Sequence, residues 1–277
     1  MIQNILIGFK RFAVLIPGIA IAYFATLDLL PYFDRRLPLG LAVFVTYIIT
    51  AYVLIPGAIR LLRMVKPAKH LPLYCVTPDG FASDPLNIGI KATRRQLIMA
   101  MESSGWHMAD RHTLKNVSLI GLSTLFNRTY KKAPVSSLYL FGRKQDLAFQ
   151  IPLKSKGGNR HHVRFWATTY DDKNRLSFSA IHWQNRRSHL KGDELLWVGA
   201  ASLDNGFGLI RHNFQVTHMI DPDTNKERDL IVADLESSQI VNKTESIKLG
   251  EPYKLINRVF NGSLHTDGKM TVVTLKK

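Results

Sequence analysis

The first sixty residues contain two long apolar runs. Residues 12–27 carry no charge, and residues 37–59 form a second uncharged run of 23 residues, rich in Leu, Val, Ile and Tyr. As a helix the second run would be about 34 Å long, which exceeds the hydrocarbon thickness of a bilayer. The pattern predicts a transmembrane hairpin within residues 1–66, with helices at about 12–30 and 37–62.

Charges beside these runs predict how the hairpin is inserted. Basic residues flank its two outer ends at Lys10, Arg11, Arg60, Arg63, Lys66 and Lys69, whereas the connecting loop carries only Arg35 and Arg36. Because Lys and Arg collect on the cytosolic side, we expect the N-terminus and the C-terminal domain in the cytosol. A cleaved signal peptide ending near Ala22 is less consistent, because the apolar run continues past that point. Asp28 is interpreted as an interfacial carboxylate near the end of the first helix.

From Pro67 onward the pattern changes to short elements typical of a globular domain, residues 67–277. Alternating or β-branched runs predict strands at 85–90, 137–141, 147–153, 162–169, 176–183, 195–203, 207–212, 240–249 and 270–275. Turns are expected at 157–158 and 204–206. The order of these strands favours a mainly antiparallel sheet.

About three helices are expected in this domain. The first follows a capping box, Thr93 to Gln96, and stops at Gly105; the second covers about 113–127. The third begins at Asp221-Pro222-Asp223, with Asp221 as N-cap and Pro222 in the first helical position, and runs to about Leu235. The fold class predicted is therefore α+β.

Charge distinguishes the two parts of the chain. Residues 60–277 contain 33 Lys and Arg against 19 Asp and Glu, which places +14 of the formal +16 outside the membrane segment. No nucleic-acid-binding module is recognisable, so we expect the anionic cytosolic leaflet rather than nucleic acid as the partner of this charge. Cys75 is the only cysteine, which excludes an intrachain disulfide and is compatible with a reducing compartment.

The densest polar constellation lies at 160–166. Strand alternation places Val163 and Phe165 on one face and His162, Arg164 and Trp166 on the other. Arg presents a planar fork of donors and Trp an aromatic face, so this trio, with His161 and Arg143, is a candidate site for an anionic headgroup or phosphate. The alternative is a solvated strand face with a cross-strand carboxylate partner.

A second constellation surrounds His218 and Asp221. His218 could be a hydrogen-bonded core histidine, or it could join His161 or His162 and a carboxylate, Asp146 or Asp221, as acid–base or metal-binding groups. The sequence contains no HExxH, paired CxxC, GxSxG or P-loop motif. We therefore expect no resident metal or cofactor, and the chain is not clearly an enzyme.

Several motifs in a fixed order resemble the LssY-like C-terminal domain family over most of residues 80–237. They are Pro85-Leu-Asn-Ile-Gly, Gly105-Trp, the segment 133–149, His161-His-Val-Arg-Phe-Trp and Gln215-Val-Thr-His-Met-Ile-Asp-Pro-Asp. The resemblance implies a bacterial domain of uncharacterised activity, sometimes joined to a membrane-embedded phosphatase-like domain, and hence an inner-membrane location. The apolar runs here lack the Lys, Arg and His of such a phosphatase. Met219 stands where the resemblance implies a second histidine.

Two hypotheses follow. The first is a membrane-anchored, non-enzymatic module that binds an anionic or lipidic ligand or a membrane protein partner. The second is a phosphoesterase-like hydrolase that uses His161, His162 and His218 with a carboxylate, which requires these side chains to converge.

Overall fold

The structure is a computed structural model, and it describes residues 16–55, 57–58, 71–78, 80, 82–110, 113, 130, 132–140, 142–153, 159–168, 192–209, 216–257 and 262–276. Side chains are described in these ranges except at 206–218, 253–257 and 262–264. The chain divides into two compact units, residues 1–66 with 78–81, and residues 67–77 with 82–277.

The N-terminal unit contains two apolar helices. The first, Ile16–Asp34, includes a π-helical stretch, η1 (Ala25–Leu29), and ends in α2 (Leu30–Asp34). The second is built from α3 (Leu39–Ile49) and the π-helical η2 (Thr50–Leu54). The small residues Ala25 and Ala42 are buried, while large apolar side chains such as Ile19 and Phe44 are exposed. Only Ile16–Asp34, among the described helices, is long and apolar enough to cross a membrane, so the structure shows one candidate span.

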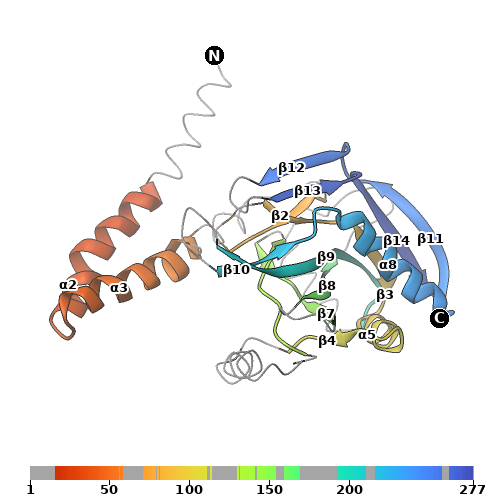
Figure 1. The fold of residues 1–277 in the computed structure, drawn as a ribbon, viewed down its shortest axis with the longest axis horizontal. Helices are drawn as coiled ribbons and strands as arrows, with labels where there is room; N and C mark the ends of the chain where they lie inside the picture. The colour runs from red at the N-terminus through yellow and green to blue at the C-terminus, as the bar shows by residue number, and fades with distance from the viewer. Residues whose placement is uncertain are drawn as a thin grey trace, which may run out of the picture. The chain divides into compact units, whose positions relative to one another are not determined.

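The larger unit is α+β, as predicted, and is organised around an eight-stranded sheet (Figure 1). The strand order is β11-β14-β3-β9-β8-β7-β4, and β10 pairs with β9 beside this path. All pairs are antiparallel except β14 with β3. The strands are β3 (Ile88–Ala92), β4 (His107–Met108), β7 (Leu147–Pro152), β8 (Arg160–Thr168), β9 (Leu195–Leu209), β10 (Val216–Ile220), β11 (Val241–Lys248) and β14 (Lys269–Leu275).

Two smaller sheets accompany it. One has the order β2-β1-β5-β6, formed by β1 (Tyr74–Val76), β2 (Ala82–Pro85), β5 (Tyr139–Leu140) and β6 (Arg143–Lys144). The other is a hairpin of β12 (Tyr253–Asn257) and β13 (Gly262–Thr266).

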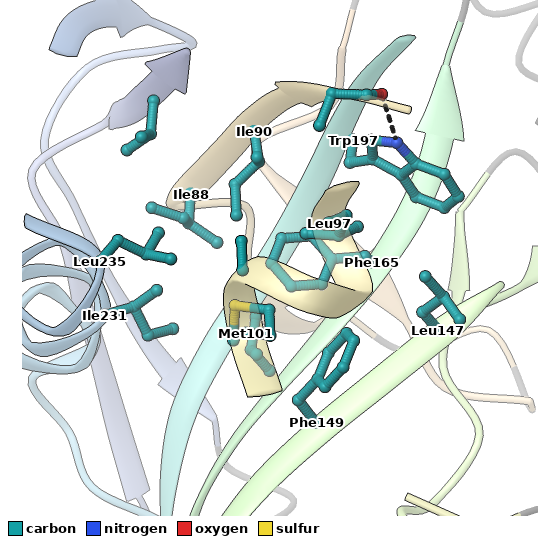
Figure 2. Close-up of a cluster of buried hydrophobic side chains, with 14 of the residues drawn as sticks. Ile88, Ile90, Leu97, Met101, Leu147, Phe149, Phe165, Trp197, Ile231 and Leu235 are labelled. Atoms are coloured by element: carbon teal, nitrogen blue, oxygen red, sulfur yellow. Dashed lines mark hydrogen bonds between the residues drawn. The ribbon is translucent and has the colours of Figure 1, made fainter. Parts of the chain in front are cut away.

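Helices α5 (Arg94–Ser103) and α8 (Thr224–Ser237) cover one face of the large sheet. Figure 2 shows Leu97 and Met101 of α5 and Ile231 and Leu235 of α8 around Phe165 and neighbouring strand residues. Each large apolar side chain buried in this way contributes about 1.5–3 kcal/mol. The opposite face is covered differently, by a second apolar cluster that includes Cys75, Leu140 and Trp166.

Local signals placed several elements correctly. Thr93 Oγ1 accepts the N–H of Gln96, and the Gln96 side chain accepts the N–H of Thr93, so the predicted capping box is present. α5 ends before Gly105, whose φ of +87° is left-handed. The strands expected at 147–153, 162–169, 240–249 and 270–275 are confirmed within one or two residues.

Two sequence predictions are wrong. No turn interrupts 204–206: β9 is one strand of 15 residues, since its first part pairs with β8 and its last part with β10. Asp221 is not the N-cap of the last helix. Its carboxylate accepts the N–H of Asp223, and Asp223 caps Asn225, so Pro222 precedes the cap rather than opening the helix.

Three of the predicted elements cannot be compared with the structure. The helix at 113–127, apart from Thr113, the strand at 176–183 and the turn at 157–158 fall outside the described residues. The β12–β13 hairpin was not expected from the sequence, because neither strand has a clear alternation of apolar and polar residues.

Candidate functional site

Strand β8 sends its two adjacent histidines to opposite faces of the sheet. Val163 and Phe165 join the core under the helices, and Trp166 joins the apolar cluster on the other face, so the predicted alternation is confirmed. However, His162, Arg164 and Trp166 are 0%, 4% and 0% exposed. They do not form the open surface that the sequence suggested, because further segments of the chain cover this face.

His162 lies at the centre of a buried polar cluster. Its Nε2 is 3.0 Å from Ser202 Oγ and also accepts from Arg164 Nη1. Arg164 Nη1 and Ser202 Oγ each donate to Asp84 Oδ2, at 2.8 Å. Ser202 faces His162 directly across the β8–β9 pair, whereas Asp84 comes from β2. Strand pairing therefore builds most of this cluster.

The cluster continues along β8 and β9 to a second ion pair. Arg160 Nε donates to Asp204 Oδ2 at 2.9 Å, and Arg160 Nη1 donates to Gln150 Oε1 at 2.8 Å. Asp204 Oδ1 lies 3.2 Å from His162 Nδ1, although the two atoms are not aligned for a hydrogen bond. Since an arginine can only donate, Nε2 of His162 is an acceptor and the ring proton belongs on Nδ1, which faces Asp204.

The same cluster binds an irregular segment of backbone. Gln150 Nε2 donates to the carbonyl of Ala133 at 2.7 Å, and Arg164 Nε donates to the carbonyl of Ser136 at 3.1 Å. Arg164 Nη2 donates to the Ser136 hydroxyl at 3.0 Å. Buried carbonyls that no strand can pair are thus satisfied by side chains.

Electrostatics keep the Asp84 carboxyl of this cluster ionised. Burial alone would raise the pKa of Asp84, but the Arg164 charge and the hydrogen bond from Ser202 outweigh it and hold the pKa well below its usual range. Next to it, burial and the charge of Asp84 raise the pKa of the Cys75 thiol well above its ordinary value. Cys75 is therefore an unreactive, neutral core thiol.

In space, Ser202, His162 and Asp204 lie in the serine–histidine–aspartate series of a serine-hydrolase triad. Their surroundings, however, do not suit that role. Ser202 is 0% exposed and donates its proton to Asp84, while Arg164 occupies Nε2 of His162. A nucleophile needs an open approach and a base with a free lone pair. The arrangement instead fastens β2 and the 133–136 segment to the sheet.

Arg143 and Asp146, both candidates from the sequence, form an ion pair beside Trp166 that has a structural role. Their side chains pair at 2.7 Å, and both bind the backbone of Ala167. The indole N–H of Trp166 donates to the carbonyl of Arg143 at 3.0 Å. These three residues hold β6 against β8 and leave no exposed anion site among them.

His161 has a different environment on the opposite face. Its Nδ1 lies 2.8 and 3.0 Å from the two carboxylate oxygens of Glu227 on α8. The His161 side chain is 20% exposed and that of Glu227 is 5% exposed. The hydrogen bond to Glu227 raises the pKa of His161, although partial burial opposes the shift. Within the described residues Nε2 of His161 has no hydrogen-bonding partner.

Among the described side chains, Asp221 makes no hydrogen bond to His161. Asp221 accepts the N–H of Asp223 and lies 3.4 Å from the Asn205 amide, which is a turn-stabilising role. His218 pairs through its backbone with Phe207, and its side chain is outside the described part of the structure. Over the described residues there is no cluster of three or more His, Cys, Asp or Glu that could hold a metal ion.

Sequence reasoning missed the partners of both histidines. Asp84, Ser202, Asp204 and Glu227 are separated from the β8 residues that they contact by 40 residues or more along the chain. Only the pairing of β8 with β9, and the packing of α8 on β8, brings them together. Ser202 and Asp204 are two residues apart on β9, as His162 and Arg160 are on β8. This matching spacing was the one signal in the sequence that these residues could pair.

Comparison with known proteins agrees with this domain-level description. A family model described as "LssY C-terminus" matches residues 68–270, which confirms the resemblance and extends it beyond both ends of 80–237. Searches of curated proteins and of solved structures found no match. Since the family model covers most of the chain, the protein belongs to the LssY C-terminus family.

Proposed function

We propose that this protein is anchored in the bacterial inner membrane and that its basic domain binds an anionic lipid surface on the cytosolic side. The observation that carries the proposal is the formal charge of +14 on residues 60–277, in a chain whose N-terminal part contains an apolar helix of spanning length, Ile16–Asp34. Each Lys or Arg close to an anionic leaflet contributes about 1 kcal/mol. A membrane protein partner is the alternative target for the same surface.

The buried face of β8 is not the lipid contact, because His162, Arg164 and Trp166 are enclosed. The proposed lipid contact is made by exposed basic side chains instead. Among the described residues these include Lys226, Lys243 and Lys248, whose side chains are 79%, 64% and 62% exposed. Binding of this kind depends on charge and is weakened by salt.

The anchor is proposed to be a two-helix hairpin with both ends in the cytosol. Helix Leu39–Leu54 is apolar throughout and follows the first helix after a short turn, although it is shorter than a full span in the described residues. Thiol labelling tests the topology, because Cys75 is buried. In spheroplasts an impermeant maleimide should label Arg35→Cys in the turn, and Lys243→Cys only after lysis. The reverse pattern would refute the cytosolic orientation.

Lipid binding can be measured on the full chain in nanodiscs. A donor dye on Lys243→Cys and an acceptor on lipid headgroups report how close the domain lies to the bilayer. We expect higher energy transfer in phosphatidylglycerol than in phosphatidylcholine, with the difference lost at high salt. Equal transfer in both lipids at low salt would sink the lipid proposal and favour a protein partner.

A hydrolase is the second candidate function. His161 and His162 point to opposite faces, so a site that contains both rings does not form, and His218 is outside the described side chains. One observation favours hydrolysis: His161 is paired with a carboxylate through Nδ1 and is partly exposed. Turnover of phosphoesters by the purified full chain tests this function.

A further inference from the structure

The two adjacent histidines of β8 each have a carboxylate beside Nδ1, yet only one has a ring nitrogen left over. Nε2 of His162 lies against both Arg164 and Ser202, in a cluster that is closed to solvent. In the described part of the chain, Nε2 of His161 has no partner, and the side chain is 20% exposed. The His162 ring therefore has a structural role, whereas Nε2 of the His161 ring is available for another interaction.

A histidine held in this way is suited to proton transfer. The carboxylate that accepts Nδ1–H fixes the tautomer, so Nε2 carries the lone pair, and it also stabilises the ring once a proton has been taken up. Glu227 meets this requirement with both oxygens within 3.0 Å of Nδ1. The Glu227 carboxylate is itself buried on α8, which limits its contact with water.

Charges around His161 come mainly from α8. Glu227 and Asp234 both raise its pKa. The two cations that flank Glu227 along the helix have other partners: Lys226 lies 3.9 Å from Asp223, and Arg228 pairs with Asp229 and Asp267, each at 2.8 Å. The strand neighbours opposite His161 are apolar, Leu203 on β9 and Ile151 on β7. His161 therefore has a carboxylate partner without a competing cation.

We propose that His161 and Glu227 form the acid–base dyad of a hydrolytic site for phosphoesters; this inference rests on hydrolysis, the second function proposed above. An anionic substrate suits a domain of formal charge +14, which raises the local concentration of anions. His161 is the catalytic residue, and Glu227 is a positioning residue that acts through it.

The chemical step balances with water as the only co-reactant. Nε2 of His161 takes a proton from water as the water oxygen forms a bond to phosphorus. The bond between phosphorus and the leaving alkoxide oxygen breaks, and His161 returns the proton from Nε2 to that oxygen. Nδ1–H remains directed at Glu227 throughout. The products are the phosphate, or the phosphomonoester from a diester, and the alcohol.

Kinetics on the full chain in nanodiscs test the step. The substrates are p-nitrophenyl phosphate, bis(p-nitrophenyl) phosphate and, as a neutral comparator, p-nitrophenyl acetate. His161→Gln should lower kcat/KM for a phosphoester by about 10²–10⁴-fold, the usual contribution of a general base. Glu227→Gln should lower kcat/KM and shift the acidic limb of the pH profile to lower pH, because the charge that raises the pKa of His161 is removed. His107→Gln on β4 is the matched control and should leave turnover unchanged.

Chemical modification gives a readout that needs neither turnover nor a variant. Diethyl pyrocarbonate should modify His161 on the folded wild-type chain, with a rate that rises with pH, and should spare His162. Mass spectrometry locates the adducts. If His107 is modified and His161 is not, Nε2 is unavailable and the dyad proposal is overturned.

The outcomes separate the inference from the function on which it rests. Phosphoester turnover that survives His161→Gln would leave a hydrolase but overturn the dyad. No turnover of either phosphoester, or turnover of the acetate ester alone, would overturn phosphoester hydrolysis and the dyad's role with it. Turnover that is lost in His161→Gln, with thermal unfolding unchanged, supports both.

Discussion

Arg164 of β8 and Asp84 of β2 form an ion pair at 2.8 Å, in which each side chain is only 4% exposed. The pair joins the large sheet to the β2-β1-β5-β6 sheet, and Asp84 also accepts a hydrogen bond from the Ser202 hydroxyl. A buried ion pair adds little stability over an apolar pair, but loss of one partner leaves a desolvated charge. The cluster is therefore sensitive to single substitutions.

Asp84→Asn should destabilise the domain by about 3–5 kcal/mol, because Arg164 keeps its charge in a buried site. Urea unfolding of the full chain in detergent measures the change. Glu251→Gln is the control: Glu251 pairs with Lys248 on the surface, and its loss should cost less than about 1 kcal/mol.

Acid should weaken the same interaction. Since the folded-state pKa of Asp84 is lowered, its contribution is complete above the ordinary carboxyl pKa of about 3.9 and declines as pH falls through the folded value. The difference in unfolding free energy between wild type and Asp84→Asn should be constant near neutrality and shrink in acid. A difference that shrinks instead toward alkaline pH would contradict this assignment.

His161 and Glu227 should show the opposite dependence. The folded-state pKa of His161 is raised, so protonation stabilises the native domain below the ordinary histidine pKa of about 6.5, and the benefit is lost as pH rises through the folded value. Wild type should exceed Glu227→Gln in stability most at pH 6 and least at pH 9. Thermal unfolding across this range checks the sign, and an unchanged gap would show that the pair is not proton-linked.

Gly199 is required by close approach rather than by backbone conformation. It lies between Ile88 and Phe165 on the neighbouring strands, and a Cβ there would come within 2.6 Å of Ile88 Cγ2 and 2.7 Å of Phe165 Cε1. Gly199→Ala should cost about 1–3 kcal/mol through overpacking. Gly89→Ala, whose nearest neighbours would be 3.0 and 3.2 Å away, should cost less, and chemical denaturation ranks the two.

The capping box of α5 offers a smaller test. Thr93→Ala removes the acceptor for the Gln96 N–H and should cost about 1 kcal/mol, whereas Thr93→Ser keeps the hydroxyl and should be nearly neutral. Hydrogen exchange at the first turn of α5 should rise in the alanine variant alone. Equal exchange in both variants would mean that the hydroxyl does not hold this helix end.

Local features of this chain could be predicted from the sequence because their causes lie within a few residues. The apolar run at 16–34 produces a helix of spanning length, Thr93 and Gln96 are three residues apart, and alternation on β8 separates Phe165 from Trp166. The same local reasoning failed at Asn205 and Gly206, which are common turn residues. There, pairing with β8 and β10 on either side keeps β9 extended.

The fate of the two histidines was decided by tertiary structure. Alternation by itself requires that His161 and His162 face opposite ways, but it does not say which ring is enclosed. Asp84, 80 residues before Arg164, closes one side, and Glu227, 66 residues after His161, leaves the other partly open. Such partners depend on strand register and helix packing, which are set by many contacts along the whole domain. The sequence by itself determined the apolar N-terminal helix, the charge and the family, while the candidate site exists only in the folded sheet.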